Sequence, residues 1–312
     1  MEPDHRTDPG RAAHDGLTDG GAPADAAVEV QRHRPMLLGM AYRMLGSTGD
    51  AEDVVQDAYL RWRDVDRSEV REPRRYLSRT VTRLALDRLR ERKAHASYVG
   101  PWLPEPVATA PPPFDPLETV EQRDSVSTAT LHLMERLDPV ERAVFVLRSA
   151  FDLPYAEIAG IVDRTPEHSR QLYRRATARL AEDRRRFAPS RREHAVLLER
   201  FLVAAREGDL ATLRSLLHDD AVAWTDGGGR AKAARNPVSG ADRVARFFAG
   251  IHTRGRPPHE LLELNGAPGA ILTLSGGPQV LTFSVDGDRI SAVFMVTNPD
   301  KLHGLRLLPS GL

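Results

Sequence analysis

Apolar residues recur at helical spacing along two segments in the first third of the chain. In "GDAEDVVQDAYLRWRD" the apolar stripe is Ala51, Val54, Val55, Ala58 and Trp62. In "REPRRYLSRTVTRLALDRLRERK" it is Leu77, Val81, Leu84, Ala85 and Leu89. Residues three or four apart share one face of a helix, so each segment predicts a helix with one buried face. Asp50 is the predicted N-cap of the first, with Glu52 and Asp53 in its first turn.

The opposite faces of these two helices are charged. The first presents Asp53, Gln56, Asp57 and Leu60. It is either a docking surface or a solvated face with one stray leucine, and the pattern alone leaves both open. The second presents Arg79, Arg83 and Arg90, with Asp87 between the last two. This face suits contact with phosphates, although charged helix faces are usually just solvated.

A second helical block contains a helix-turn-helix pattern. Asp138, Pro139 and Glu141 form a capping box that predicts a helix start. A short helix through residues 155–162 follows, then a tight turn at 163–164 and a second helix opening at Thr165. This second helix would bury Leu172, Ala176 and Leu180 and expose polar side chains that can reach phosphates and base edges, namely His168, Arg170, Gln171, Arg174 and Arg175. Small helical bundles can share this pattern.

The last third of the chain changes from helical to strand periodicity. Ser190 and Glu193 form a capping box before an apolar helix that ends at Gly208 and buries Leu197, Leu198, Phe201, Leu202 and Ala205. Asp209 caps a second helix, residues 210–217, and a third has Val244, Phe247, Phe248 and Ile251 at helical spacing. Strand patterns follow, among them "VLTFSVDGDRISAVFMVT", in which Asp286-Gly287 predicts a hairpin turn. The order predicts helices followed by an antiparallel sheet.

Between the helical blocks lies "YVGPWLPEPVATAPPPFDP", residues 98–116. Its prolines exclude a helix or a central strand, yet it carries the large apolar pair Trp102 and Leu103. A polyproline-like chain of this length extends about 60 Å, at about 3.1 Å per residue. That distance is nearly two DNA turns of about 34 Å each, so the segment is long enough to hold two DNA-reading domains apart.

Composition and charge limit the number of domains and the classes of function that fit this chain. The 312 residues leave room for two or three domains, and the formal net charge of zero argues against a uniformly basic nucleic-acid binder. Arginines nevertheless crowd residues 83–93 and 170–192, which suggests separate contacts with a polyanion. The absence of cysteine excludes disulfides and thiolate metal sites and fits a reducing cytoplasm. Residues 1–27 are polar, without the apolar core of a signal peptide, and predict a disordered tail; no apolar run could span a membrane.

Taken in order, the acidic helix, the arginine-rich helix, the spacer and "LDPVERAVFVLRSAFDLPYAEIAGIVDRTPEHSRQLYRRATARL" resemble a bacterial RNA polymerase sigma factor of the extracytoplasmic-function class. The resemblance implies sigma region 2 at 28–95, a proline-rich linker at 96–120 and sigma region 4 at 121–187. In that family region 2 binds the clamp helices of the polymerase largest subunit and melts the -10 promoter element. Region 4 reads the -35 element.

Carried onto this chain, the resemblance assigns roles to particular residues. The polymerase-docking face would be Asp53, Gln56, Asp57 and Leu60. The residues near the opened DNA strand would be Arg83, Arg88, Arg90, Arg92 and Lys93. Those on the -35 duplex would be Thr165, His168, Ser169, Arg170, Gln171, Arg174 and Arg175. The chain departs from the family at the turn, where Asp163 replaces the usual glycine and Arg164 an apolar residue.

Residues 190–312 resemble a SnoaL-like domain of the nuclear-transport-factor fold, in which a curved sheet wraps helices around a conical pocket. The expected fold is therefore multidomain, with two all-α domains followed by an α+β domain with a curved antiparallel sheet. A sigma-factor subgroup with this fusion carries "WLPEP"-, "DGGG"- and "NPDKL"-like motifs. The interdomain regulatory residues would be Trp102, Leu103, Pro104, Asp226, Gly227, Gly228, Gly229, Asn298, Pro299, Asp300 and Lys301. Trp102, Leu103 and Pro104 are expected to pack against the C-terminal domain near the "DGGG" turn or the "NPDKL" tail.

The predicted function is promoter-specific initiation with core RNA polymerase and promoter DNA as partners, regulated by the C-terminal domain. We expect no enzymatic activity, cofactor, metal or membrane, and a cytoplasmic, nucleoid-associated location; an unidentified small ligand in the last domain stays open. Two alternatives remain: an isomerase or cyclase with Asp226 as general base, and a one-component repressor. Asp226 before three glycines also fits a sharp turn, and His218, Asp219 and Asp220 are expected to cap or solvate a helix end.

Overall fold

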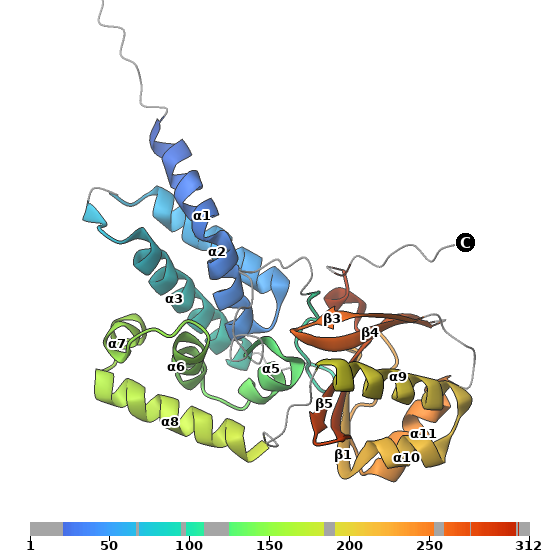
Figure 1. Cartoon of the computed structure of the whole chain (residues 1–312). Coiled ribbons are helices and arrows are strands. Elements are labelled where there is room, and N and C mark those ends of the chain that lie inside the picture. The colour runs from blue at the N-terminus through green and yellow to red at the C-terminus, as the bar shows by residue number, and fades with distance from the viewer. Residues whose placement is uncertain are drawn as a thin grey trace, which may run out of the picture.

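The structure is a computed structural model that describes residues 21–66, 69–94, 98–108, 125–183, 191–252, 259–274, 276–303 and 305. Figure 1 shows a helical part, a sheet domain beside it and helix α5 between the two. Of the predicted tail, residues 1–20 lie outside the described residues. Residues 21–27, which we predicted to belong to the tail, are instead the beginning of the first helix.

The two helical blocks pack into one core. The first contains α1 (Gly21–Leu45), α2 (Thr48–Arg63) and α3 (Pro73–Ala94). The second contains α5 (Thr128–Met134), α6 (Pro139–Ser149), α7 (Tyr155–Val162) and α8 (Pro166–Asp183). Every residue of the three predicted apolar stripes in α2, α3 and α8 is buried, and residues of both blocks belong to the same hydrophobic cluster. The blocks are therefore in direct apolar contact.

One predicted helix start is wrong in detail. Ser47, not Asp50, caps α2, and its hydroxyl accepts a hydrogen bond from the Asp50 backbone N–H at 3.2 Å. The start of α6 is as predicted, with Asp138 at the N-cap and Pro139 as the first residue, although the Asp138 side chain makes no cap bond. The nearly buried Glu141 carboxylate pairs with Arg179 and Arg175 of α8, because a buried charge needs an opposite charge more than a backbone N–H needs a cap.

The sheet domain begins with α9 (Arg191–Glu207) and α10 (Leu210–Leu216), and α11 (Ala241–His252) follows later in the chain. Asp209 caps α10 as predicted, accepting from the Thr212 N–H at 3.0 Å. The Ser190 capping box lies outside the described residues. His218, Asp219 and Asp220, expected at a helix end, belong to strand β1 instead.

Six strands form one sheet in the order β2-β1-β6-β5-β4-β3. Their bounds are β1 Leu217–Asp226, β2 Val238–Ser239, β3 His259–Leu264, β4 Ala267–Leu274, β5 Gly277–Asp286 and β6 Arg289–Val296. The predicted hairpin joins β5 to β6, with Asp286 opposite Arg289. The sheet is antiparallel except between β1 and β6, which run parallel; the chain passes from one to the other through β2, α11, β3, β4 and β5.

Both faces of this sheet are apolar. Ala270, Leu281 and Val293 lie in the cluster with α9, α10 and α11. Their chain neighbours Ile271, Val280 and Phe294 lie in a different cluster, together with Leu103 from the linker. Successive strand residues point to opposite faces, so the second face is covered by other parts of the chain. Among the described helices, none is long and apolar enough to cross a membrane.

Candidate interdomain site

The described part of the linker, residues 98–108, runs between the helical part and the sheet domain; we call it the strap. It binds both. On one side the Glu105 N–H donates to the Gly46 carbonyl at 2.8 Å, and on the other Ala108 forms a β-bridge with Leu264. Far from being a bare spacer, this half of the linker is bonded to the sheet domain near both of its ends and to the helical part between them.

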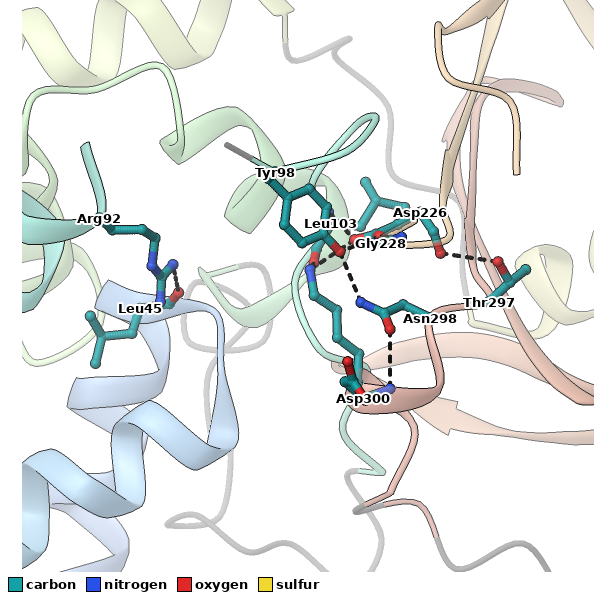
Figure 2. A network of polar contacts seen from close by, with 10 residues as sticks. Leu45, Arg92, Tyr98, Leu103, Asp226, Gly228, Thr297, Asn298 and Asp300 are labelled. Atoms are coloured by element: carbon teal, nitrogen blue, oxygen red, sulfur yellow. Dashed lines mark hydrogen bonds and ion pairs between the residues drawn. The ribbon is translucent and has the colours of Figure 1, made fainter. Parts of the chain in front are cut away.

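Asp226, at the end of β1, is the centre of the site. Its carboxylate is fully buried and accepts four hydrogen bonds. Oδ1 accepts from the Tyr98 hydroxyl at 2.5 Å and the Gly228 N–H at 3.0 Å, and Oδ2 from the Leu103 N–H and the Lys301 ammonium, both at 2.8 Å. Figure 2 shows these groups converging from the strap, β1 and the C-terminal segment. The carboxylate thus ties three segments together.

Lys301 lies at the end of the 3₁₀ turn η2 (Pro299–Lys301). Its ammonium donates to the Leu103 carbonyl at 2.5 Å and lies 4.1 Å from the ring centre of Trp102 and 4.8 Å from that of Tyr98. Burial lowers the pKa of Lys301, and the neighbouring carboxylate of Asp226 works against that shift. Burial, with the same carboxylate, raises the pKa of Tyr98 above its ordinary value, so its hydroxyl stays a donor.

The glycines after Asp226 allow this close packing. Gly228 and Gly229 both have positive φ, as the predicted sharp turn requires. A Cβ on Gly228 would lie 2.2 Å from Asn298 Nδ2, which itself donates to the Tyr98 hydroxyl at 3.0 Å. The Asn298 Oδ1 accepts from the Asp300 N–H at 3.1 Å, fixing the start of η2. The "DGGG" and "NPDKL" segments therefore meet at the strap.

Trp102 contacts both sides. The Arg92 guanidinium of α3 lies 5.4 Å from its ring centre. Arg92 belongs to the helical part, whereas Lys301, the other cation near this ring, belongs to the sheet domain. A Cβ on Gly46 would lie 2.5 Å from the edge of the same ring. Leu103 is fully buried against the sheet. Pro104 is buried and also lies close to Gly46 of the helical part, where a Cβ on Gly46 would be 3.4 Å from the Pro104 Cβ. Pro299 and Asp300 are exposed, and Asp300 pairs with Arg230 at 3.2 Å.

Sequence reasoning missed a second junction at Asn265, in the turn between β3 and β4. Its Oδ1 accepts from the Val107 N–H at 3.0 Å, and its Nδ2 donates to the Tyr42 hydroxyl at 2.5 Å and the Val126 carbonyl at 3.0 Å. Asn265 is buried and has a φ of 52°. One amide therefore joins the sheet domain, the strap and both helical blocks.

The strap also caps the helix that carries the predicted docking face. A carboxylate oxygen of Glu105 accepts from the Thr48 N–H at 2.7 Å and from the Thr48 hydroxyl. The Tyr42 hydroxyl donates to the Glu105 carbonyl at 2.6 Å. A carboxylate at a helix N-terminus is favoured by the unpaired N–H groups there, so the strap helps to fix the start of α2.

Comparison with known proteins fits this organisation. Residues 30–95 match the Sigma-70 region 2 family, and residues 127–180 match the Sigma-70, region 4 family. The chain is 35% identical over 291 residues to the ECF RNA polymerase sigma factor SigJ of Mycobacterium tuberculosis, an alignment that covers 88% of this chain and 93% of that protein. The chain belongs to the ECF RNA polymerase sigma factors.

Two further comparisons agree. The sigma factor is 31% identical over 281 residues to the probable ECF RNA polymerase sigma factor SigI of the same species, covering 88% of this chain and 93% of that one. The crystal structure of the M. tuberculosis extracytoplasmic function sigma factor SigJ matches with a TM-score of 0.74 at 34% identity, over 90% of this chain and 99% of that chain. The sheet domain is therefore part of the shared structure.

The face of α2 predicted to dock on polymerase is accessible in this sigma factor. Asp53 and Gln56 are exposed, Leu60 keeps 39% of its surface exposed, and Asp57 is half-buried. Asp57 lies 4.0 Å from Arg88 of α3, a loose pair between half-exposed side chains. An exposed leucine flanked by acidic and amide groups is available to a partner.

The predicted -35 residues lie on α8, the second helix of the helix-turn-helix, except Thr165, which immediately precedes it. All but one are exposed, and these are Thr165, His168, Arg170, Gln171, Arg174 and Arg175. Ser169 is completely buried in this arrangement, so its assignment to the -35 duplex stays a prediction. Arg175 also pairs with Glu141 at 3.3 Å. Asp163 adopts the left-handed conformation, with a φ of 54°, that glycine usually supplies at this turn.

The arginines assigned to the opened DNA strand are partly engaged inside the molecule. The Arg83 guanidinium donates to Asp163 of the helix-turn-helix at 2.6 Å and to the Ile161 carbonyl at 3.3 Å. Arg92 pairs with Asp50 and donates to the Leu45 carbonyl at 2.8 Å, as Figure 2 shows for the latter. Neither is free for DNA in this arrangement. Arg88 and Arg90 keep more exposed side chains, and the Lys93 side chain lies outside the described residues.

Asp226 lacks the features of a general base in this arrangement. A carboxylate offers about four acceptor positions, and the four donors above occupy that number. Among the described residues there is also no group of three His, Asp or Glu side chains that could hold a metal ion. The arrangement is suited to holding segments together.

Proposed function

We propose that the chain binds core RNA polymerase and directs promoter-specific initiation, and that its own sheet domain regulates this activity. The observation that carries the first part is the ordered pair of sigma regions, at 30–95 and 127–180, within a relationship to sigma factors that covers 88% of the chain. The protein would act by binding and not by turnover, on promoter DNA in the nucleoid. The exposed Leu60 and its polar neighbours on α2 support polymerase docking.

Regulation is proposed from the closed arrangement of the domains. Reading two promoter elements nearly two turns of DNA apart requires the sigma regions to separate, by up to about 60 Å of extended linker. Here the two helical blocks share one core, and the strap is bonded both to the helical part and to the sheet domain. A closed form held by the sheet domain would lower the population able to bind polymerase on a promoter. Weakening the interdomain contacts would raise that population.

Run-off transcription with purified core polymerase tests the proposal. The full chain and a chain ending before Asn298 would be compared on promoters found by footprinting the complete protein with core enzyme. We expect initiation at discrete start sites, with a higher yield from the shortened chain because Lys301 and Asn298 are gone. No promoter-specific transcript from either chain would exclude the sigma activity.

Docking has its own test. Asp57→Arg reverses the charge within the α2 face and should reduce retention on immobilised core polymerase at least tenfold. Glu199→Arg makes the same charge change on the exposed side of α9, away from α2, and should bind as well as the native chain. Equal retention of both variants would instead favour a repressor-like protein that does not use this face.

A further inference from the structure

The ammonium of Lys301 sits in an enclosed site built from three segments. Its side chain is 8% exposed, and the carboxylate of Asp226 beside it is completely buried. Two aromatic faces, those of Trp102 and Tyr98, flank the nitrogen, and the Leu103 carbonyl accepts one of its protons. Rings, carboxylate and carbonyl are all groups that attract a cation.

The parts of the site hold one another without the lysine. The Asp226 carboxylate accepts from Tyr98, Leu103 and Gly228, all independently of Lys301. The Asn298 amide fixes the Tyr98 hydroxyl from a second direction. Such a frame is organised before its cation arrives, which reduces the cost of binding. Lys301, by contrast, is carried on a turn of three residues close to the end of the chain.

The geometry also selects one kind of cation. A primary ammonium has three protons, and here two go to oxygens, the Leu103 carbonyl at 2.5 Å and Asp226 Oδ2 at 2.8 Å. The third side of the nitrogen faces the Trp102 ring at 4.1 Å. A quaternary ammonium could use the rings but has no proton for either oxygen, so the Leu103 carbonyl and Asp226 Oδ2 would each lose the hydrogen bond that Lys301 supplies, which is unfavourable in a buried site.

We propose that this frame is a binding site for primary alkylammonium compounds, such as polyamines, which Lys301 occupies as an intramolecular ligand. A soluble amine competes with Lys301, releases the C-terminal turn and leaves the strap bonded to Asp226. The regulatory consequence rests on the proposed function, because it matters for transcription only if the closed form restrains initiation. Binding itself is independent of polymerase.

Lys301→Ala tests the site directly. The removed atoms, from Cγ to Nζ, correspond to n-propylammonium, which serves as the probe. Calorimetric titration should show saturable one-to-one binding to this variant, at least tenfold tighter than to the native chain, where Lys301 competes. Lys301→Met keeps a neutral stem in the site and should bind no better than the native chain. Lys232→Ala removes an exposed lysine of the same domain and should also behave as the native chain does.

Hydrogen exchange locates the binding. With Lys301→Ala, n-propylammonium should slow exchange of the Leu103 and Gly228 amides, while tetramethylammonium at equal ionic strength should not. In the native chain, high n-propylammonium should speed exchange at residues 299–303 with the strap still protected, a readout that survives if Lys301→Ala does not fold. Absence of saturable binding together with unchanged exchange in the native chain would make Lys301 an ordinary ion-pair partner and overturn the proposal. Since no polymerase is present, this result is separate from the transcription test.

Discussion

At the scale of single residues, His194 in α9 is a buried imidazole whose pKa is governed by burial alone. Burial lowers its pKa from 6.5 to about 4, and among the described residues its Nε2 has no hydrogen-bond partner. The folded protein therefore keeps His194 neutral at pH values where the unfolded chain binds a proton. The contribution of neutral His194 to the free energy of unfolding is fully present above about pH 6.5 and is lost as the pH falls toward 4. Between pH 7 and pH 5 the loss is about 2 kcal/mol.

His194→Leu should remove most of that pH dependence. Denaturant unfolding at pH 7 and pH 5, followed by far-ultraviolet circular dichroism, measures it. His168→Leu replaces an exposed histidine of α8 and should leave the native slope unchanged. The same slope for native protein and His194→Leu would show that other groups govern the acid response.

Asn265 offers a second prediction, based on hydrogen bonds alone. Asn265→Gly keeps the left-handed backbone of φ 52° but leaves the Val107 N–H, the Tyr42 hydroxyl and the Val126 carbonyl without this partner. We expect a loss of about 3 kcal/mol in unfolding free energy, since each buried group that loses its partner costs about 1 kcal/mol or more.

Asn265→Ala is the matched comparison, because it removes the same bonds and adds backbone strain of about 1 kcal/mol. The order of stability should be native, then Asn265→Gly, then Asn265→Ala in thermal or denaturant unfolding. A glycine variant as stable as the native protein would mean that water replaces the amide at no cost.

The role of Asn265 could not be predicted, for a physical reason. Asn265-Gly266 between two strand patterns predicts a hairpin turn, and the structure contains that turn. The turn by itself accounts for an asparagine at this position, so the sequence does not indicate a second role for Asn265. Its partner Tyr42 is 223 positions away in the chain. Asp226 and Lys301 were predicted as interdomain residues only through the resemblance, because their pairing also spans distant segments.

At the scale of elements, α3 is held to the helix-turn-helix by its charges. Asp163 in the turn pairs with Arg83 at 2.6 Å and lies 4.0 Å from Arg79. Asp163 is exposed and both arginines are half-exposed, so the contribution of these pairs to stability is at most about 1 kcal/mol and is screened by salt. Asp163→Gly removes both pairs and relieves the left-handed backbone. It should raise the fraction of molecules with α3 and α7 apart up to about fivefold at low salt.

Distance measurements between labels on α3 and α8 can follow this opening. The chain has no cysteine, so two introduced cysteines suffice for labelling. Asp152→Gly is the matched control, because Asp152 is also an aspartate with positive φ and pairs with Arg148 of its own block. It should leave the α3-to-α8 distance distribution unchanged. If Asp163→Gly behaves in the same way, the charges do not hold the blocks together.

Helices were predicted better than their ends and surroundings. The stripes of α2, α3 and α8 follow from spacing, which depends only on the helix itself. The start of α6 was predicted correctly, but the pairing of Glu141 with Arg179 was not, because Arg179 lies on another helix. The second apolar face of the sheet had a signal that we did not use, since "ISAVFMV" in β6 is nearly apolar at every position, as in strands covered on both sides. The pattern of alternation in β5 drew attention to one face only.

At the scale of the whole molecule, the order of the domains followed from sequence but their closed packing did not. Proline content predicts an extended linker and cannot say whether that linker is in solvent or against a surface. Trp102 and Leu103 were the exception, because large apolar residues in a spacer indicate a covering surface. That expectation placed them against the sheet domain. The structure adds that Trp102 also meets Arg92 and Gly46, so the residue bridges two domains.

Trp102→Ala should therefore open the molecule. It removes contacts with the cations of Arg92 and Lys301, each worth about 0.5 to 2 kcal/mol, and leaves a void between the domains. A total of about 3 kcal/mol would raise the open population more than a hundredfold. Small-angle scattering should show a larger radius of gyration, and run-off transcription a higher yield per polymerase. Trp102→Phe keeps an aromatic face, so its radius of gyration and transcript yield should lie between those of the native protein and Trp102→Ala.

Gly46→Ala approaches the same contact from the helical side. Its Cβ would lie 2.5 Å from the Trp102 ring, so the ring must move, and the positive φ of 65° adds local strain. If the ring is what joins the domains, Gly46→Ala opens the native protein but has little further effect on opening when Trp102 is already alanine, because only the local strain remains. Independent, additive effects on the radius of gyration would contradict a shared contact. Native dimensions and transcript yield for Trp102→Ala would contradict the bridge itself, and would shift its role to Asp226 and Asn265, whose bonds to the strap do not involve the ring.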